Sequence, residues 1–175
     1  MQEKIGWTAE SHFGKMLHQW WHGLEEDRAS RAILRRCATL DAVTLSPAYQ
    51  RFYRYMLACN CWSVDAAPWQ NDKLAAIAGL LAHIKTEDTQ SLPVSMWNAK
   101  EEKLLVSELR FRDLLKVQET DDLFVSLRRI LPLLDYKANI FGLAHDVYNW
   151  GNPHPKFNIP KQWAYSYRWP VKQSA

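Results

Sequence analysis

The sequence predicts an all-α fold: two small helical bundles packed together, with about eight or nine helices in all. Apolar residues recur at three- and four-residue spacings along most of the chain, which is the period of a helix face. No segment alternates apolar and polar residues as a half-buried strand would, and no fixed repeat occurs. With 175 residues, 47% of them hydrophobic, the chain is long and apolar enough to bury a core.

Four helices are expected in the first half of the chain. The first carries apolar positions at helical spacing and ends near Gly23. Ser46 and Pro47 are a typical N-cap and first helical residue, because serine accepts from a helix N–H and proline lacks the N–H that would stay unpaired. The expected helices span residues 13–24, 29–40, 48–59 and 73–85.

A linker between the bundles is expected at residues 86–99. This segment is polar, contains Pro93 and lacks helical periodicity. We therefore expect an N-terminal bundle of residues 1–92, which holds the densest run of arginines, and a C-terminal bundle of residues 93–175.

Four further helices are expected after the linker. Thr120 is a candidate N-cap, and the two aspartates that follow it suit the positive end of the helix dipole. Pro132 lies inside an apolar run and predicts a kink or an early stop, and Gly151 is a natural C-cap. The expected helices span residues 100–115, 120–135, 139–150 and 161–169.

The composition favours a soluble, cytoplasmic protein. The formal charge of +3 and the pI near 8.7 permit nucleic-acid binding without requiring it. Cys37, Cys59 and Cys61 are odd in number and no secretory signal accompanies them, so we expect reduced structural thiols. No stretch approaches the roughly 18 apolar residues of a membrane span, so no membrane partner is expected.

The usual motifs of catalysis and metal binding are not found. His18 and His22 lie four residues apart, but Gln19 replaces the glutamate of a HExxH zinc motif. We interpret both as helix-surface residues and keep a metal-dependent enzyme as a minor alternative. The signatures GxGxxG, GxxxxGK[ST] and GxSxG do not occur. We expect no catalytic residue, no metal, no cofactor and no small-molecule substrate.

Arginines are concentrated between residues 28 and 54, where six occur against the single acid Asp41. On a helix, with 100° between residues, the first three share a stripe about 60° wide and the fourth flanks it. The last two follow on the next helix, spaced three apart among aromatic residues. The six are Arg28, Arg31, Arg35, Arg36, Arg51 and Arg54.

An ordinary solvated helix face is the alternative explanation for this cluster. Three features favour phosphate binding instead. Arginine suits bidentate phosphate recognition, closely spaced like charges repel until a polyanion joins them, and arginine with aromatics is typical of single-strand binding. We expect binding without base specificity, with some cations paired to Glu25, Asp113 or Asp135. The second half of the chain adds Arg110, Arg112, Lys116, Arg128 and Arg129.

Six segments occur in the order and spacing of a known family. They are DRASRAILRRC (27–37), SPAYQRFYR (46–54), LAAIAGLLAHIK (74–85), VSELRFRDLLKVQETDDLFVSLRRILPLLD (106–135), NIFGLAHDVYNW (139–150) and QWAYSYRW (162–169). Together they resemble the CasB family, the small subunit of the type I-E CRISPR Cascade complex. The resemblance covers roughly residues 13 to 169, and the 106–135 block is its most specific part.

This resemblance implies an all-helical, non-catalytic subunit that contacts crRNA and target DNA, helps hold the displaced non-target strand and stabilises the R-loop. Its implied partners are a second copy of itself and the backbone and large subunits of Cascade. A small helical regulator that reads duplex DNA through residues 28–54 is the alternative. The family's basic contact positions fall on Arg28, Arg31, Arg35, Arg36, Arg110, Arg112, Arg128 and Arg129.

Overall fold

The computed structural model describes residues 4–172, which form ten α-helices, two 3₁₀-helices and four strands of two residues each. The first half contains α1 (His12–Gly23), α2 (Arg28–Arg36), α3 (Leu40–Thr44), α4 (Pro47–Ala58) and α5 (Pro68–Leu81). The second half contains α6 (Leu92–Ser95), α7 (Glu108–Leu115), α8 (Thr120–Ile130), η1 (Leu131–Leu134), α9 (Ile140–Asn149), η2 (Pro155–Phe157) and α10 (Ile159–Ser166). The all-α prediction is confirmed.

Polar N-caps set the start of several helices. The capping side chain accepts from the backbone N–H three residues later at Ser11, Asp27, Ser46, Ser107 and Asn139. Each bond pairs one of the donors that a helix start leaves unsatisfied. Pro47 follows as the first residue of α4, so the start predicted there is confirmed.

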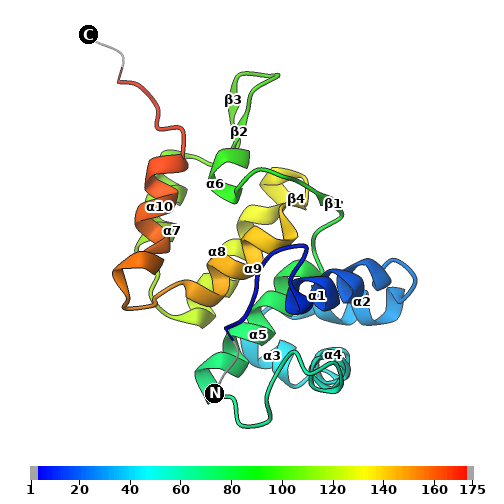
Figure 1. Ribbon diagram of the computed structural model, residues 1–175. Coiled ribbons are helices and arrows are strands. Elements are labelled where there is room, and N and C mark those ends of the chain that lie inside the picture. The colour runs from blue at the N-terminus through cyan, green and yellow to red at the C-terminus, as the bar shows by residue number, and fades with distance from the viewer. Residues whose placement is uncertain (1–3, 173–175) are drawn as a thin grey trace.

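Helix α5 lies in the core and contacts α2, α3, α4, α8 and α9. Every residue from 73 to 84 is buried. A Cβ added at Gly79 of α5 would lie 2.8 Å from Cε2 of Phe124 on α8 and 2.9 Å from Cγ2 of Val43 on α3. Only glycine therefore lets these two helices pack so closely against α5. Figure 1 shows α8 and α9 between the first five helices on one side and α7 with α10 on the other.

Two short strand pairs complete the fold. Strand β1 (Thr86–Glu87) pairs in parallel with β4 (Lys137–Ala138), which ties the segment after α5 to the segment after η1. Strands β2 (Trp97–Asn98) and β3 (Lys103–Leu104) form an antiparallel hairpin. The hairpin projects from the helical body next to α6 (Figure 1).

The helix predicted over residues 100–115 is wrong in its first half. Lys103 and Leu104 form β3, and α7 begins only at Glu108. Leu104, Leu105 and Val106 are consecutive apolar residues, and three in a row cannot share one face of a helix. In the non-helical segment between β3 and α7, Val106 is fully buried instead. Ser107 then caps α7, accepting from the N–H of Arg110 at 3.3 Å.

Two predictions about α8 have different outcomes. The predicted cap Thr120 is the first helical residue, and Glu119 is the N-cap. The interruption predicted at Pro132 is confirmed, because α8 ends at Ile130 and the chain continues as η1. Proline cannot donate the α-helical hydrogen bond, and the tighter 3₁₀ turn does not require it here.

The boundary predicted between residues 92 and 93 stays a prediction. Helices on both sides of it contribute buried side chains to one core cluster. None of the helices in the described part of the chain is both long enough and apolar enough to span a bilayer.

Candidate nucleic-acid interface

The eleven basic residues singled out in the sequence lie in three places. The inner arginine cluster, beside the end of α5, consists of Arg31, Arg35 and Arg128. The outer set on α2 and α4 consists of Arg28, Arg36, Arg51 and Arg54. The set on α7, its C-cap and α8 consists of Arg110, Arg112, Lys116 and Arg129.

Arg31 binds backbone carbonyls rather than facing solvent. Its Nε donates to the carbonyl of Ala82 at 3.2 Å, and its Nη2 donates to the carbonyl of Ile84 at 2.8 Å. Both residues follow the last turn of α5, where carbonyls lack helical partners. Burial lowers the pKa of Arg31, and the neighbouring charge of Arg35 lowers it further. This side chain therefore supplies hydrogen-bond donors to the carbonyls that follow α5.

Arg35 lies over the ring of Tyr136, and Arg128 binds the backbone of Arg35. The Cζ of Arg35 lies 5.6 Å from the ring centroid, and the Nζ of Lys85 lies 4.7 Å from it. Arg128 donates from Nη2 to the carbonyl of Arg35 at 3.2 Å. The buried Nε of Arg128 has no hydrogen-bond partner within residues 4–172. Cation–π contacts and a carbonyl thus hold these two arginines in place.

His83 is buried beside the inner arginine cluster. Burial, followed by the charges of Arg128, Arg35 and Arg31, lowers the pKa of His83 to about 4. Its ring stacks on that of Tyr136, with 6.4 Å between centroids. None of the ion pairs found among the described residues involves the cluster.

The outer set is more open to solvent. Arg51 donates from Nη2 to the hydroxyl of Ser30 at 3.1 Å. Hydrogen bonds from Ser30 lower the pKa of Asp27, the N-cap of α2, and the charge of Arg51 adds to that effect. Within the outer set, the side chains of Arg28, Arg36 and Arg54 are exposed and have no partner in the described part of the chain.

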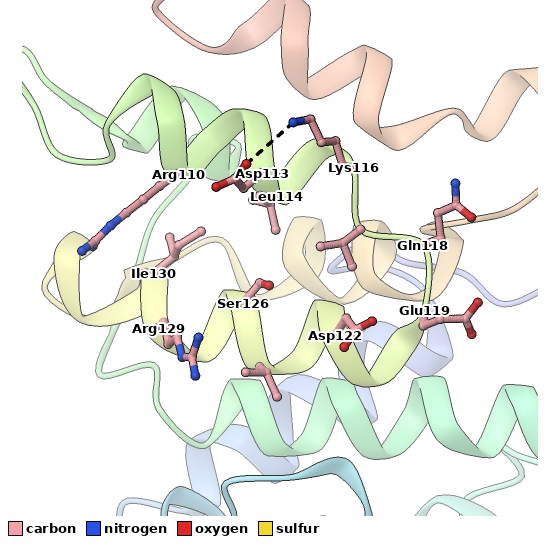
Figure 2. A pocket seen from close by; sticks show the side chains of 12 residues that line it. Arg110, Asp113, Leu114, Lys116, Gln118, Glu119, Asp122, Ser126, Arg129 and Ile130 are labelled. Carbon is pink, nitrogen blue, oxygen red and sulfur yellow. Dashed lines mark ion pairs between the residues drawn. The ribbon is translucent and has the colours of Figure 1, made fainter.

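A groove of about 1020 Å³ runs between α7 and α8. Figure 2 shows Arg110 reaching from α7 toward the end of α8, where Arg129 lies, while Asp122 lies near the start of α8. Lys116 pairs with Asp113 at 3.8 Å. The exposed side chains of Arg110, Arg112 and Arg129 have no partner among the residues described. The groove is therefore basic at one end and acidic at the other.

Most of the ion pairs predicted between basic residues and Glu25, Asp113 or Asp135 do not form among the described residues. Lys116–Asp113 is the only predicted pairing that forms within the described residues, and neither Glu25 nor Asp135 makes one. The inner arginines use carbonyls and a ring instead, because the end of α5 presents unpaired acceptors. Sequence reasoning also missed Lys85, which no local pattern marks, since Tyr136 lies 51 residues further along the chain.

The minor metal hypothesis rested on His18 and His22. His18 lies 2.6 Å through Nε2 from a carboxylate oxygen of Glu87, and its ring stacks on Phe141. His22 is exposed at the end of α1. The three cysteines are free thiols, with Cys37 buried. No group of three or more metal-ligating side chains gathers among residues 4–172.

The fold and these surfaces define an all-α protein whose arginines are divided between an internal cluster and solvent-facing sets. The family described as CRISPR-associated protein Cse2 matches residues 30–167, which is most of the chain. The chain therefore belongs to the Cse2 (CasB) family, whose members are non-catalytic small subunits of the type I-E CRISPR Cascade. This confirms the resemblance seen in the sequence. No curated protein matches the chain.

Proposed function

We propose that this subunit uses its solvent-facing arginines to contact crRNA, target DNA and the displaced non-target strand without reading their sequence, and so stabilises the R-loop. One observation carries the proposal: six exposed arginines have no intramolecular partner within the described residues. They are Arg28, Arg36, Arg54, Arg110, Arg112 and Arg129.

The energetics of an R-loop suit such a surface. The RNA–DNA heteroduplex that forms is about as stable as the DNA duplex it replaces, so contacts to the backbone can tip the exchange. Arginine binds phosphate oxygens in a bidentate manner, and phosphates are present whatever the target sequence. The unpaired guanidinium groups give up no internal ion pair when they bind a strand.

The proposal includes the setting in which the subunit works. Its partners are a second copy of itself and the backbone and large subunits of Cascade, in the cytoplasm. Arginines on both α2–α4 and α7–α8 give it two surfaces for a nucleoprotein assembly.

Binding of a mixed-sequence single-stranded DNA at several salt concentrations tests the proposal. The logarithm of the binding constant should fall linearly with the logarithm of salt concentration, because bound arginines release counterions. Arg36→Gln/Arg54→Gln should bind more weakly and reduce that slope by about 0.7 for each phosphate that is no longer neutralised. Lys100→Gln/Lys103→Gln, which removes the same charge from the β2–β3 hairpin, is the matched control.

Two results would contradict the proposal. A flat salt response, or equal weakening in the test and control variants, would show that the arginines do not act as a phosphate-binding surface. Strong preference for one duplex sequence over random competitors would favour the alternative of a regulator that reads DNA through residues 28–54.

A further inference from the structure

A second cavity, of about 1080 Å³, lies away from the arginines of the proposed function. It is formed by the segment before α1, the loop between α4 and α5, helix α9 and η2. Sites for small organic ligands commonly measure about 300–1000 Å³, so this space is large enough for a nucleotide. Its aromatic lining consists of Trp7, Trp62, His145, Tyr148 and Phe157.

The aromatic rings form a continuous wall. The Trp7 centroid lies 5.1 Å from that of Tyr148 and 6.1 Å from that of His145. Trp62 lies 6.3 Å from Tyr148, and Phe157 lies 6.3 Å from His145. All five side chains are only partly buried. A flat apolar ligand would remove their exposed ring surface from water, which is favourable.

Charges around the cavity discriminate between ligand classes. Lys4 and Lys156 line it, and Asp65 is the acid among its lining residues. This balance disfavours a cationic guest, although aromatic cages commonly bind cations. It favours a ligand that joins a flat ring to a negative group. The exposed amide of Asn60 has no partner within the described residues and offers both a donor and an acceptor.

We propose that this aromatic cavity takes an unpaired nucleobase, with Lys4 and Lys156 contacting the adjoining phosphate. An unpaired nucleotide combines a ring that stacks on aromatic side chains with a phosphate that attracts ammonium groups. The proposal rests on the proposed function, because the base belongs to a strand that the arginines hold. Stacking accepts any base, so the site adds affinity without sequence preference.

An abasic strand separates the two proposals. The test compares the affinity for a mixed-sequence single-stranded DNA with the affinity for a strand of equal length that carries the same phosphates but no bases. Wild-type protein should bind the base-bearing strand about 5- to 150-fold more tightly, which is the usual contribution of stacking one base. Phe157→Leu and Trp7→Leu should reduce this preference and leave binding of the abasic strand unchanged.

Trp169→Leu is the matched control, because Trp169 is 39% exposed and packs on Phe111 and Tyr167 instead of lining the cavity. Its preference for the base-bearing strand should equal that of the wild type. Equal binding of both strands by wild-type protein would overturn the cavity proposal and leave the arginine proposal standing. Failure to bind either strand would overturn the proposed function itself.

Tryptophan fluorescence gives a second readout that does not depend on a variant folding. The base-bearing strand should quench the emission of wild-type protein because a stacked base lies against Trp7 and Trp62. The abasic strand should leave the emission unchanged. Equal quenching by both strands would contradict a base in the cavity.

Discussion

Arg28 and Arg31 lie three residues apart on α2, yet they belong to different regions of the molecule. Arg28 is exposed and has no partner in the described part of the chain. Arg31 reaches back to two carbonyls at the end of α5. The same contrast separates Arg36, which is exposed, from Arg35, which is half-buried against Tyr136. Residue type and spacing are therefore poor guides to an arginine's role.

This difference shows when an arginine stabilises the fold instead of remaining in solvent. A guanidinium group carries five donors, so it can satisfy carbonyls that a helix end leaves unpaired. Where no such acceptor lies opposite, the group stays in solvent and can bind a phosphate. We therefore expect the inner arginine cluster to affect stability and the outer arginines to affect nucleic-acid binding.

The largest effect is expected for Arg31→Ala. The free energy of unfolding should fall by about 2–3 kcal/mol, because the buried carbonyl of Ala82 loses its charged donor and that of Ile84 keeps only the bond from Trp21. Arg28→Ala, the matched control on the same helix, should change stability by less than about 0.5 kcal/mol. Urea unfolding measures both. Equal decreases would erase the distinction between the two regions.

The outer arginines should show the opposite behaviour. Arg36→Gln/Arg54→Gln should weaken single-stranded DNA binding about 10-fold near 0.1 M salt, because two guanidinium groups no longer bind phosphates. Its unfolding midpoint should match that of the wild type, since neither side chain has a partner in the described part of the chain. Fluorescence anisotropy and urea unfolding measure the two quantities. A decrease in stability comparable to that of Arg31→Ala would count against this division.

A third effect is expected only at acid pH. The pKa of His83 falls from its ordinary 6.5 to about 4 in the folded protein. Between these values the unfolded chain binds a proton that the folded chain does not, so the free energy of unfolding decreases as pH falls from 6.5 to 4. His83→Gln should flatten this part of the stability profile.

The exposed His22→Gln variant is the control for His83. It should retain the wild-type decrease between those pH values, as measured by thermal unfolding. If His83→Gln retains the decrease as well, burial and the charges of the inner arginine cluster do not lower the pKa of His83 in the folded protein.

The smallest effect is expected for Asp113→Asn. The Lys116–Asp113 pair is 3.8 Å long, and its side chains are 72% and 65% exposed, so its removal should change stability by less than about 0.5 kcal/mol. Releasing Lys116 should raise affinity for single-stranded DNA slightly, by less than about threefold. Glu101→Gln, on the β2–β3 hairpin, removes the same charge elsewhere and is the control. An equal gain in both variants would show a net-charge effect only.

Local signals in the sequence predicted most of the helices. Ser46 and Pro47 marked the start of α4, and Pro132 marked the end of α8, because capping and the missing proline N–H act within a few residues. The segment before α7 was mispredicted because Val106 is placed by the core it enters. Ser107, a strong N-cap, was the overlooked signal for the true helix start.

The sequence by itself determined the helical class, the family and the positions of the arginines, since periodicity, capping and ordered motifs are written along the chain. Only the tertiary structure decided which arginines are exposed to solvent and which bind internal groups. Arg31 meets carbonyls 51 and 53 residues away, and Arg128 meets Arg35 across 93 residues. The cavity likewise joins Trp7 to Tyr148. Such contacts depend on how distant elements pack, and no pattern within one helix encodes them.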